Sequence, residues 1–141
     1  MIDRFIEITT EEIDFKKLYN FCKKNHLGAI NVFFGVTRNF NNEKKVLYLE
    51  YESYKDMAEK IISKIIDEMI NKWDVEKVAV SHRSGQVDIG QISMVVVISS
   101  EHRKSSISAT DFFIDRLKEI VPIWKKEFYE DGESWLSSTP G

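Results

Sequence analysis

The chain has 141 residues, of which 43% are hydrophobic and 30% are charged, and its formal net charge is -3. These values fit a single domain over residues 1–141, and the slightly acidic balance counts against a general nucleic-acid coat. No apolar run approaches the length of a membrane span and no secretory leader pattern follows Met1, so we expect a cytoplasmic protein without membrane contact.

The first half of the chain predicts a strand, a helix and two further strands. Residues 4–8 form the first strand, and the spacing of Thr9 and Glu12 is that of a capping box, which predicts that a helix follows directly. Residues 29–36 are almost continuously apolar, which favours a strand covered on both faces. Residues 46–52 alternate between two faces, and we expect them to pair with 29–36 as a hairpin.

The second half predicts two longer helices and three more strands. Apolar residues recur every four positions over 54–73, the clearest helical stripe in the chain. Residues 75–82 and 92–99 are expected to form an antiparallel pair across a turn with two glycines. A helix over 101–121 then leads into a last strand at 123–129. Because hairpins interrupt any regular βαβ rhythm, the expected class is α+β, a mixed or antiparallel sheet packed by about three helices.

The segment 117–127, L-K-E-I-V-P-I-W-K-K-E, places three lysines around an apolar core. Pro122 is expected to end the preceding helix, because proline disfavours the helical conformation of the residue before it. Burial and neighbouring positive charge disfavour an ammonium ion, so Lys118 or Lys125 could lose its proton more easily than a solvated lysine. The cluster therefore indicates a tuned amine or an anion clamp; the alternative is that these lysines simply face water.

Three further side chains are candidates for binding an anion. Arg38 follows a predicted strand, and its guanidinium suits a carboxylate or phosphate. His102 and Arg103 fall in the first turn of a predicted helix, where free N–H groups and the helix dipole favour a phosphate. The alternative is a histidine in a capping network beside an exposed arginine. His82, in contrast, alternates with buried positions and is expected to have a structural role.

Other chemical motifs are missing from the sequence. Histidines at positions 26, 82 and 102 lack metal-ligand spacing, and there is no glycine-rich phosphate loop and no G-x-S-x-G nucleophile motif. The single cysteine, Cys22, excludes an internal disulfide and is expected to be buried and inert. We therefore expect neither a metal site nor a bound cofactor.

Five segments, in this order, resemble the large, catalytic subunit of molybdopterin synthase, over a span from about Gly28 to Trp135. The segments are G-A-I-N-V-F-F-G-V-T-R-N at 28–39, L-E-Y-E-S-Y at 49–54, H-R-S-G at 82–85, S-S-E-H-R at 99–103 and D-R-L-K-E-I-V-P-I-W-K-K-E at 115–127. Several segments in the right order make this a specific resemblance. One departure is the tail at 136–141, which lacks the arginine that family members often carry after the last tryptophan.

The resemblance implies an α/β hammerhead fold and a sulfur transferase that converts cyclic pyranopterin monophosphate to molybdopterin by inserting two dithiolene sulfurs. It implies that the sulfur arrives as a thiocarboxylate on the C-terminal Gly-Gly of a small ubiquitin-like subunit. It also implies a dimer of large subunits within a heterotetramer. Matched by motif position, the catalytic lysines are Lys118 and Lys125, the substrate-binding residues are Arg38, His102 and Arg103, and Phe33 is an aromatic pocket residue.

Two other functions explain the same charges. One is a non-enzymatic adaptor that binds a ubiquitin-like protein through a lysine-rich surface, and the other is an RNA-binding module. The RNA-binding module should show a contiguous basic face, and the acidic net charge counts against it. A chain with one cysteine, expected to be buried, needs an external sulfur donor, which agrees with the family's thiocarboxylate partner.

Helix length separates two parts of the expected site. If 101–121 is one helix, its rise of about 1.5 Å per residue places the Cα atoms of His102 and Lys118 roughly 24 Å apart. Two side chains cannot bridge that gap across a small substrate. We therefore expect an obligate dimer in which the histidine and arginine of one protomer complete the lysine pocket of its partner.

Overall fold

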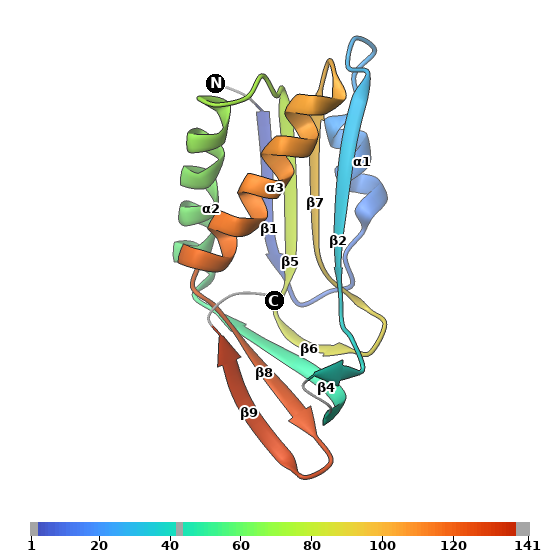
Figure 1. The fold of residues 1–141 in the computed structure, drawn as a ribbon, viewed down its shortest axis with the longest axis vertical. Coiled ribbons are helices and arrows are strands. Elements are labelled where there is room, and N and C mark those ends of the chain that lie inside the picture. The colour runs from blue at the N-terminus through green and yellow to red at the C-terminus, as the bar shows by residue number, and fades with distance from the viewer. Residues whose placement is uncertain (1–2, 42–43, 138–141) are drawn as a thin grey trace.

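The computed structural model describes residues 3–41 and 44–137, which form three helices and two sheets (Figure 1). The expected α+β class is confirmed. In chain order the elements are β1 (Asp3–Thr9), α1 (Phe15–Cys22), β2 (Ala29–Val36), β3 (Phe40–Asn41), β4 (Lys44–Ser53), α2 (Lys55–Ile70), β5 (Lys77–Arg83), β6 (Gly85–Asp88), β7 (Ile92–Ser100), α3 (Arg103–Ile120), β8 (Ile123–Tyr129) and β9 (Gly132–Ser137).

The first sheet has the strand order β1-β5-β7-β2 and is covered on both faces (Figure 1). In this sheet β1 pairs parallel with β5, whereas β5 with β7 and β7 with β2 are antiparallel. Successive residues of a strand point to opposite faces, so Val78 packs into the main core with α2 and α3, whereas its neighbour Ala79 packs with Leu18 and Cys22 of α1. This double cover explains why β5 and β7 are buried at nearly every position.

The second sheet lies beyond one end of the first (Figure 1). It has the order β3-β4-β8-β9, and β6 also pairs with β4. Pro122 lies between α3 and β8, so the expected end of the last helix is confirmed. The connection after β2 and the turn after α3 both enter this sheet, and they bring together segments that are distant in the sequence.

Two of the expected local structures are wrong. Residues 29–36 and 46–52 do not form a hairpin, because β2 pairs with β7 while β4 pairs with β8 and β6. An apolar pattern identifies a strand but does not identify its partner. The capping box is also wrong: β1 continues to Thr9, and α1 begins at Phe15 after Asp14, whose side chain accepts a hydrogen bond from the Lys17 amide at 3.3 Å.

The strand at 29–36 also differs from expectation in its surroundings. In the single chain β2 is an edge strand, with exposed fractions of 37% for Val32, 39% for Phe34 and 49% for Val36. Helix α1 covers the middle strands of this face and leaves these side chains open. The apolar sequence of β2 is therefore only half buried.

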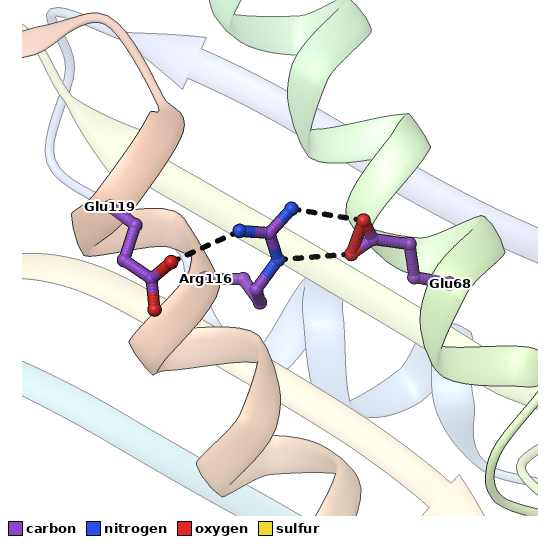
Figure 2. A network of polar contacts seen from close by, with 3 residues as sticks. All are labelled: Glu68, Arg116 and Glu119. Carbon is purple, nitrogen blue, oxygen red and sulfur yellow. Dashed lines mark hydrogen bonds and ion pairs between the residues drawn. The ribbon is translucent and has the colours of Figure 1, made fainter.

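A polar network joins α2 to the C-terminal half of α3 (Figure 2). Arg116 donates from Nε and Nη2 to the two carboxylate oxygens of Glu68, each at 3.0 Å, and from Nη1 to Glu119 at 3.1 Å. The hydrogen bonds that Arg116 donates to Glu68 lower the pKa of the Glu68 carboxyl. The network fixes the helix segment that precedes Lys118.

Replacing Arg116 with methionine should lower the Tm slightly at pH 7, and this difference should vanish in acid. The pKa of Glu68 is lower in the folded state than its ordinary value of 4.5. The stabilisation is therefore complete above that value and is lost as the pH falls through the folded-state pKa. Thermal melts from pH 7 to pH 2 measure this, with Lys64→Met as the control. A Tm difference that stays constant with pH would contradict this interpretation.

Candidate active site

A small cavity lies where the end of β2 meets β4, β7 and β8. It is lined by Phe33, Arg38 and Lys125, three of the residues that the sequence analysis selected, together with Tyr51, Ser93 and Glu127. Its volume is about 50 Å³, well below the ~300–1,000 Å³ of sites that enclose a small molecule. The cavity therefore fits one end of a ligand and leaves the rest outside this chain.

The end of β2 is shaped by Gly35. A Cβ atom at this position would lie 3.2 Å from Ser93 Oγ and 3.7 Å from the Phe33 ring, which is tighter than ordinary contact for the first atom. Ser93 Oγ also donates to the Gly35 carbonyl at 3.1 Å. The register of β2 against β7 shifts after Gly35, a bulge that bends the chain toward the second sheet and carries Arg38 to the cavity.

Lys125 is the lysine whose environment matches the expectation of a tuned amine. Burial lowers the pKa of its ammonium group, the charges of Arg38 and Lys118 lower it further, and Glu127 partly opposes them. Lys118 lies in the last turn of α3 and is exposed, so the expected burial does not act on it in the single chain. Arg38 and Lys118 both lie near enough to Lys125 for their charges to act on it.

Replacing Lys125 with methionine should raise the free energy of unfolding at pH 7, and the gain should shrink as the pH rises toward 10.5. The folded state disfavours the Lys125 ammonium, whose pKa is lower than the ordinary 10.5. The unfolded chain therefore binds more protons between the two values, and wild-type stability recovers there. Urea melts at several pH values test this. Lys125→Arg keeps its charge and should show no gain at pH 7; an equal gain would contradict the desolvation account.

Glu127 is a site residue that the sequence analysis did not select. It is 4% exposed, accepts a hydrogen bond from Asn41 Nδ2 at 2.8 Å, and accepts another from the Tyr129 hydroxyl. Side chains two apart on a strand share a face, so Lys125 and Glu127 had to point the same way. This two-residue spacing of Lys125 and Glu127 could be read from the sequence. The carboxylate places a negative charge beside a cationic cavity.

His102 and Arg103 do not line this cavity. They lie at the start of α3, and Lys118 lies in its last turn. His102 occupies the N-cap position with no side-chain capping bond, and both side chains are exposed. One chain therefore brings together Phe33, Arg38, Lys118 and Lys125, and leaves the other two substrate-binding candidates at the far end of the helix.

His82 and Cys22 are of residue types that often take part in catalysis, but here both have structural roles. His82 is fully buried, its Nδ1 donates to the Arg83 carbonyl at 2.6 Å, and burial lowers its pKa to about 4, which confirms its orientation toward a packed face. Cys22 is fully buried, as expected. Within 3–41 and 44–137, no three histidine, cysteine or carboxylate side chains converge as metal ligands would.

Family members often carry an arginine after the last tryptophan, and residues 136–141 of this chain contain none. The last four of these residues lie outside the part of the chain that the structure describes. The absence of this arginine is therefore established from the sequence and not from the structure.

Comparison with known proteins gives a consistent result. The family model described as "MoaE protein" matches residues 8–120. The molybdopterin synthase catalytic subunit of Bacillus subtilis is 42% identical over 135 residues, which cover 96% of this chain and 85% of that protein. The corresponding protein of Dictyostelium discoideum is 46% identical over 130 residues, covering 91% and 82% of the two chains.

Comparison of the fold with solved structures indicates the same family. The crystal structure of molybdopterin synthase from Staphylococcus aureus superposes with a TM-score of 0.89 at 41% identity, covering 93% of this chain and 96% of that chain. A two-subunit complex of molybdopterin-converting factor from Helicobacter pylori shares the fold at 24% identity, with a TM-score of 0.75 and coverage of 92% and 88%. The chain belongs to the MoaE family, whose members are the catalytic subunits of molybdopterin synthase.

Proposed function

We propose that this chain is the catalytic subunit of a molybdopterin synthase and transfers sulfur to cyclic pyranopterin monophosphate, forming the dithiolene of molybdopterin. The observation that carries the proposal is the meeting of Phe33, Arg38 and Lys125 in one cavity, with Lys118 beside them. These residues come from two motifs, at 28–39 and 115–127, that are far apart in the sequence of a chain in this family. An adaptor that only binds a ubiquitin-like protein has no need of a tuned lysine in a cavity.

The sulfur donor is a thiocarboxylate at the C-terminal Gly-Gly of a small ubiquitin-like subunit. The name "catalytic subunit" that the relatives carry implies a second subunit. This chain cannot readily supply the sulfur itself: Cys22 is fully buried, its Sγ donates to the Val97 carbonyl, and burial raises its pKa to about 12. A cavity of about 50 Å³ suits the narrow end of an extended glycine tail.

Each residue of the site has a role that follows from its charge. Arg38 and Lys118 hold the anionic tail and the developing negative charge of the reaction. Lys125 has a lowered pKa, so it gives up and takes back a proton nearer neutral pH than an ordinary lysine does. Phe33 forms an apolar wall of the cavity.

The phosphate of the substrate binds at the start of a partner's α3. His102 and Arg103 offer cationic side chains beside the free N–H groups of that helix. Because α3 separates them from the cavity of their own chain, they serve the cavity of the second copy in a homodimer, and a small subunit at each cavity gives a heterotetramer. The substrate phosphate, held by one large subunit, and the tail of the small subunit, held at the cavity of the other, then lie in the same site.

The part of the chain that the structure describes contains no helix long and apolar enough to cross a membrane. We place the reaction in the cytoplasm, where its phosphorylated substrate is expected. The function needs no nucleic acid, and no bound cofactor is part of the proposed chemistry.

Reconstitution tests the function against the adaptor alternative. The purified chain is mixed with cyclic pyranopterin monophosphate and a thiocarboxylated small subunit, and molybdopterin is measured. We expect product to form only when all three are present, and to stop when the small subunit ends in an ordinary carboxylate. Tight binding of the small subunit without any product would favour the adaptor.

A further inference from the structure

Asn41 joins the segment that carries Arg38 to the strand that carries Lys125. Its Nδ2 donates to Glu127 Oε1 at 2.8 Å, a contact between residues 86 positions apart in the chain. We infer that Asn41 is a positioning residue of the site, which holds the Glu127 carboxylate in a fixed place beside Lys125. Through the same hydrogen bond it keeps the segment of Arg38 against the cavity. This inference rests on the proposed function, because it concerns the same cavity.

The Glu127 carboxylate is held by one of its two oxygens. Asn41 Nδ2 and the Tyr129 hydroxyl both donate to Oε1. Glu127 is 4% exposed and forms part of the cavity wall. An ionised carboxylate accepts hydrogen bonds on both oxygens, so two donors on Oε1 fix the rotation of the group and leave Oε2 available to the cavity. Asn41 and Tyr129 therefore decide where the negative charge of Glu127 lies.

The negative charge of Glu127 has two opposite effects on the proposed chemistry. It raises the pKa of Lys125, against the lowering by burial and by neighbouring positive charge. It also repels the anionic tail and substrate that the reaction brings to the cavity. Because the interaction of two charges depends on their separation, both effects depend on where the carboxylate is held. The position of this carboxylate is therefore part of the chemistry of the site.

The same hydrogen bond anchors a short strand beside the cavity. Strand β3 consists of Phe40 and Asn41, which pair with Lys45 and Lys44 of β4. Phe40 lines the cavity but is 52% exposed, so burial of its ring contributes little to holding this strand. Arg38 lies two residues before β3. The hydrogen bond from Asn41 to β8 therefore helps to keep the Arg38 guanidinium at the cavity.

Four ionisable groups surround Lys125. Tyr51 of β4 lies directly opposite it in the antiparallel pair, Glu127 lies two residues further along β8, and Arg38 and Lys118 add positive charge. Burial raises the pKa of Tyr51, and the charge of Glu127 raises it further, so the phenol is neutral at the pH of the reaction. Glu127 supplies the negative charge among these four groups. Loosening its carboxylate should let the pKa of Lys125 fall further.

Titration of Lys125 by NMR tests the inference without an assay of activity. The chain is labelled with ¹³C-lysine, and the signal of Lys125 is the one that Lys125→Arg removes. Glu127→Gln keeps an acceptor oxygen but loses the charge, so the Lys125 titration should move to lower pH, which sets the full size of the effect. Asn41→Leu keeps the approximate size of the side chain but cannot donate, so it should give part of the same shift.

Tyr129→Phe is a second variant, which carries the test even if Asn41→Leu does not fold. It loses the other donor to Glu127 and keeps its ring, so it should shift the titration in the same direction. The double variant should approach the shift of Glu127→Gln. Tyr48→Phe is the matched control: Tyr48 stacks on Phe128 at 4.4 Å and does not line the cavity, so the titration should stay unchanged.

The pH dependence of product formation gives a second readout. The limb of the pH–rate profile that belongs to Lys125 should move to lower pH in Asn41→Leu. A purely structural role would lower the rate equally at every pH and would overturn the inference. So would a Lys125 titration that stays unchanged in Asn41→Leu and Tyr129→Phe, whether or not Glu127→Gln shifts it. A wild-type chain that forms no product would contradict the proposed function and leave the NMR result standing.

Discussion

Replacing Lys118 with alanine should reduce molybdopterin formation by about 10²–10⁴-fold, the range that one positioned acid, base or charge contributes, and should leave the fold intact. Lys118 is exposed in the last turn of α3, while its neighbour Leu117 is fully buried and holds the helix to the core. The positive charge of Lys118 contributes to the lowered pKa of Lys125, which lines the cavity. Activity should therefore fall while stability does not.

The measurement is product formation beside a thermal melt of the same protein. Lys64→Ala, an exposed lysine of α2, is the matched control and should keep full activity. Lys118→Arg separates two roles, because an arginine keeps the charge but does not exchange its proton at neutral pH. A folded Lys118→Ala variant with near-normal product formation would remove this lysine from the mechanism.

Reversing the charge of Arg103 should weaken substrate binding by about 10–100-fold, the loss expected when a charged hydrogen bond to phosphate is removed. Arg103 is the first residue of α3, and an acidic side chain is favourable at a helix N-terminus, so Arg103→Glu should fold normally. The effect should appear mainly as a rise in KM at saturating small subunit.

The neighbouring lysine supplies the control for that charge reversal. Lys104 is exposed in the same turn, so Lys104→Glu changes the net charge equally without touching the proposed phosphate site. Titration calorimetry with the substrate compares the two variants. An unchanged affinity in Arg103→Glu would place the phosphate elsewhere on the protein.

Sequence patterns predicted the two longer helices well, because a helix is a local structure. The four-residue repeat over 54–73 corresponds to α2 at Lys55–Ile70, and Pro122 ends α3 where expected. Strand pairing depends on residues far apart in the chain. The sequence marked 29–36 as a strand, but nothing local distinguished β4 from β7 as its neighbour, and the true pairing is with β7.

The site residues were also predicted only in part: their identity followed from the sequence, but the burial of their side chains did not. The motifs identified Phe33, Arg38 and Lys125, and the fold brings them to one cavity. The burial expected for Lys118 did not follow from its apolar neighbours, because adjacent helix residues point in different directions: Leu117 is buried and Lys118 is exposed.

The distance along α3 is the reason to consider a second chain at all. A helix keeps residues at its two ends apart, whatever their side chains can do, so the sequence alone allowed the separation of His102 and Lys118 to be predicted. The structure keeps them at opposite ends of one 18-residue helix. A site that uses both must therefore draw on two copies.

A mixed dimer of Lys118→Ala and Arg103→Glu chains tests this shared site most directly. The two chains carry different tags, and the mixed dimer is purified through both and assayed with the small subunit and substrate. The assay uses a substrate concentration near the wild-type KM, where the Arg103→Glu parent has little activity because its KM is raised. A shared site leaves one intact cavity, made by Lys118 of one chain and Arg103 of the other, so the mixed dimer should recover about half of wild-type activity while each parent stays far below that level. A mixed dimer as inactive as its parents would contradict the account, since a site contained in one chain is broken in both.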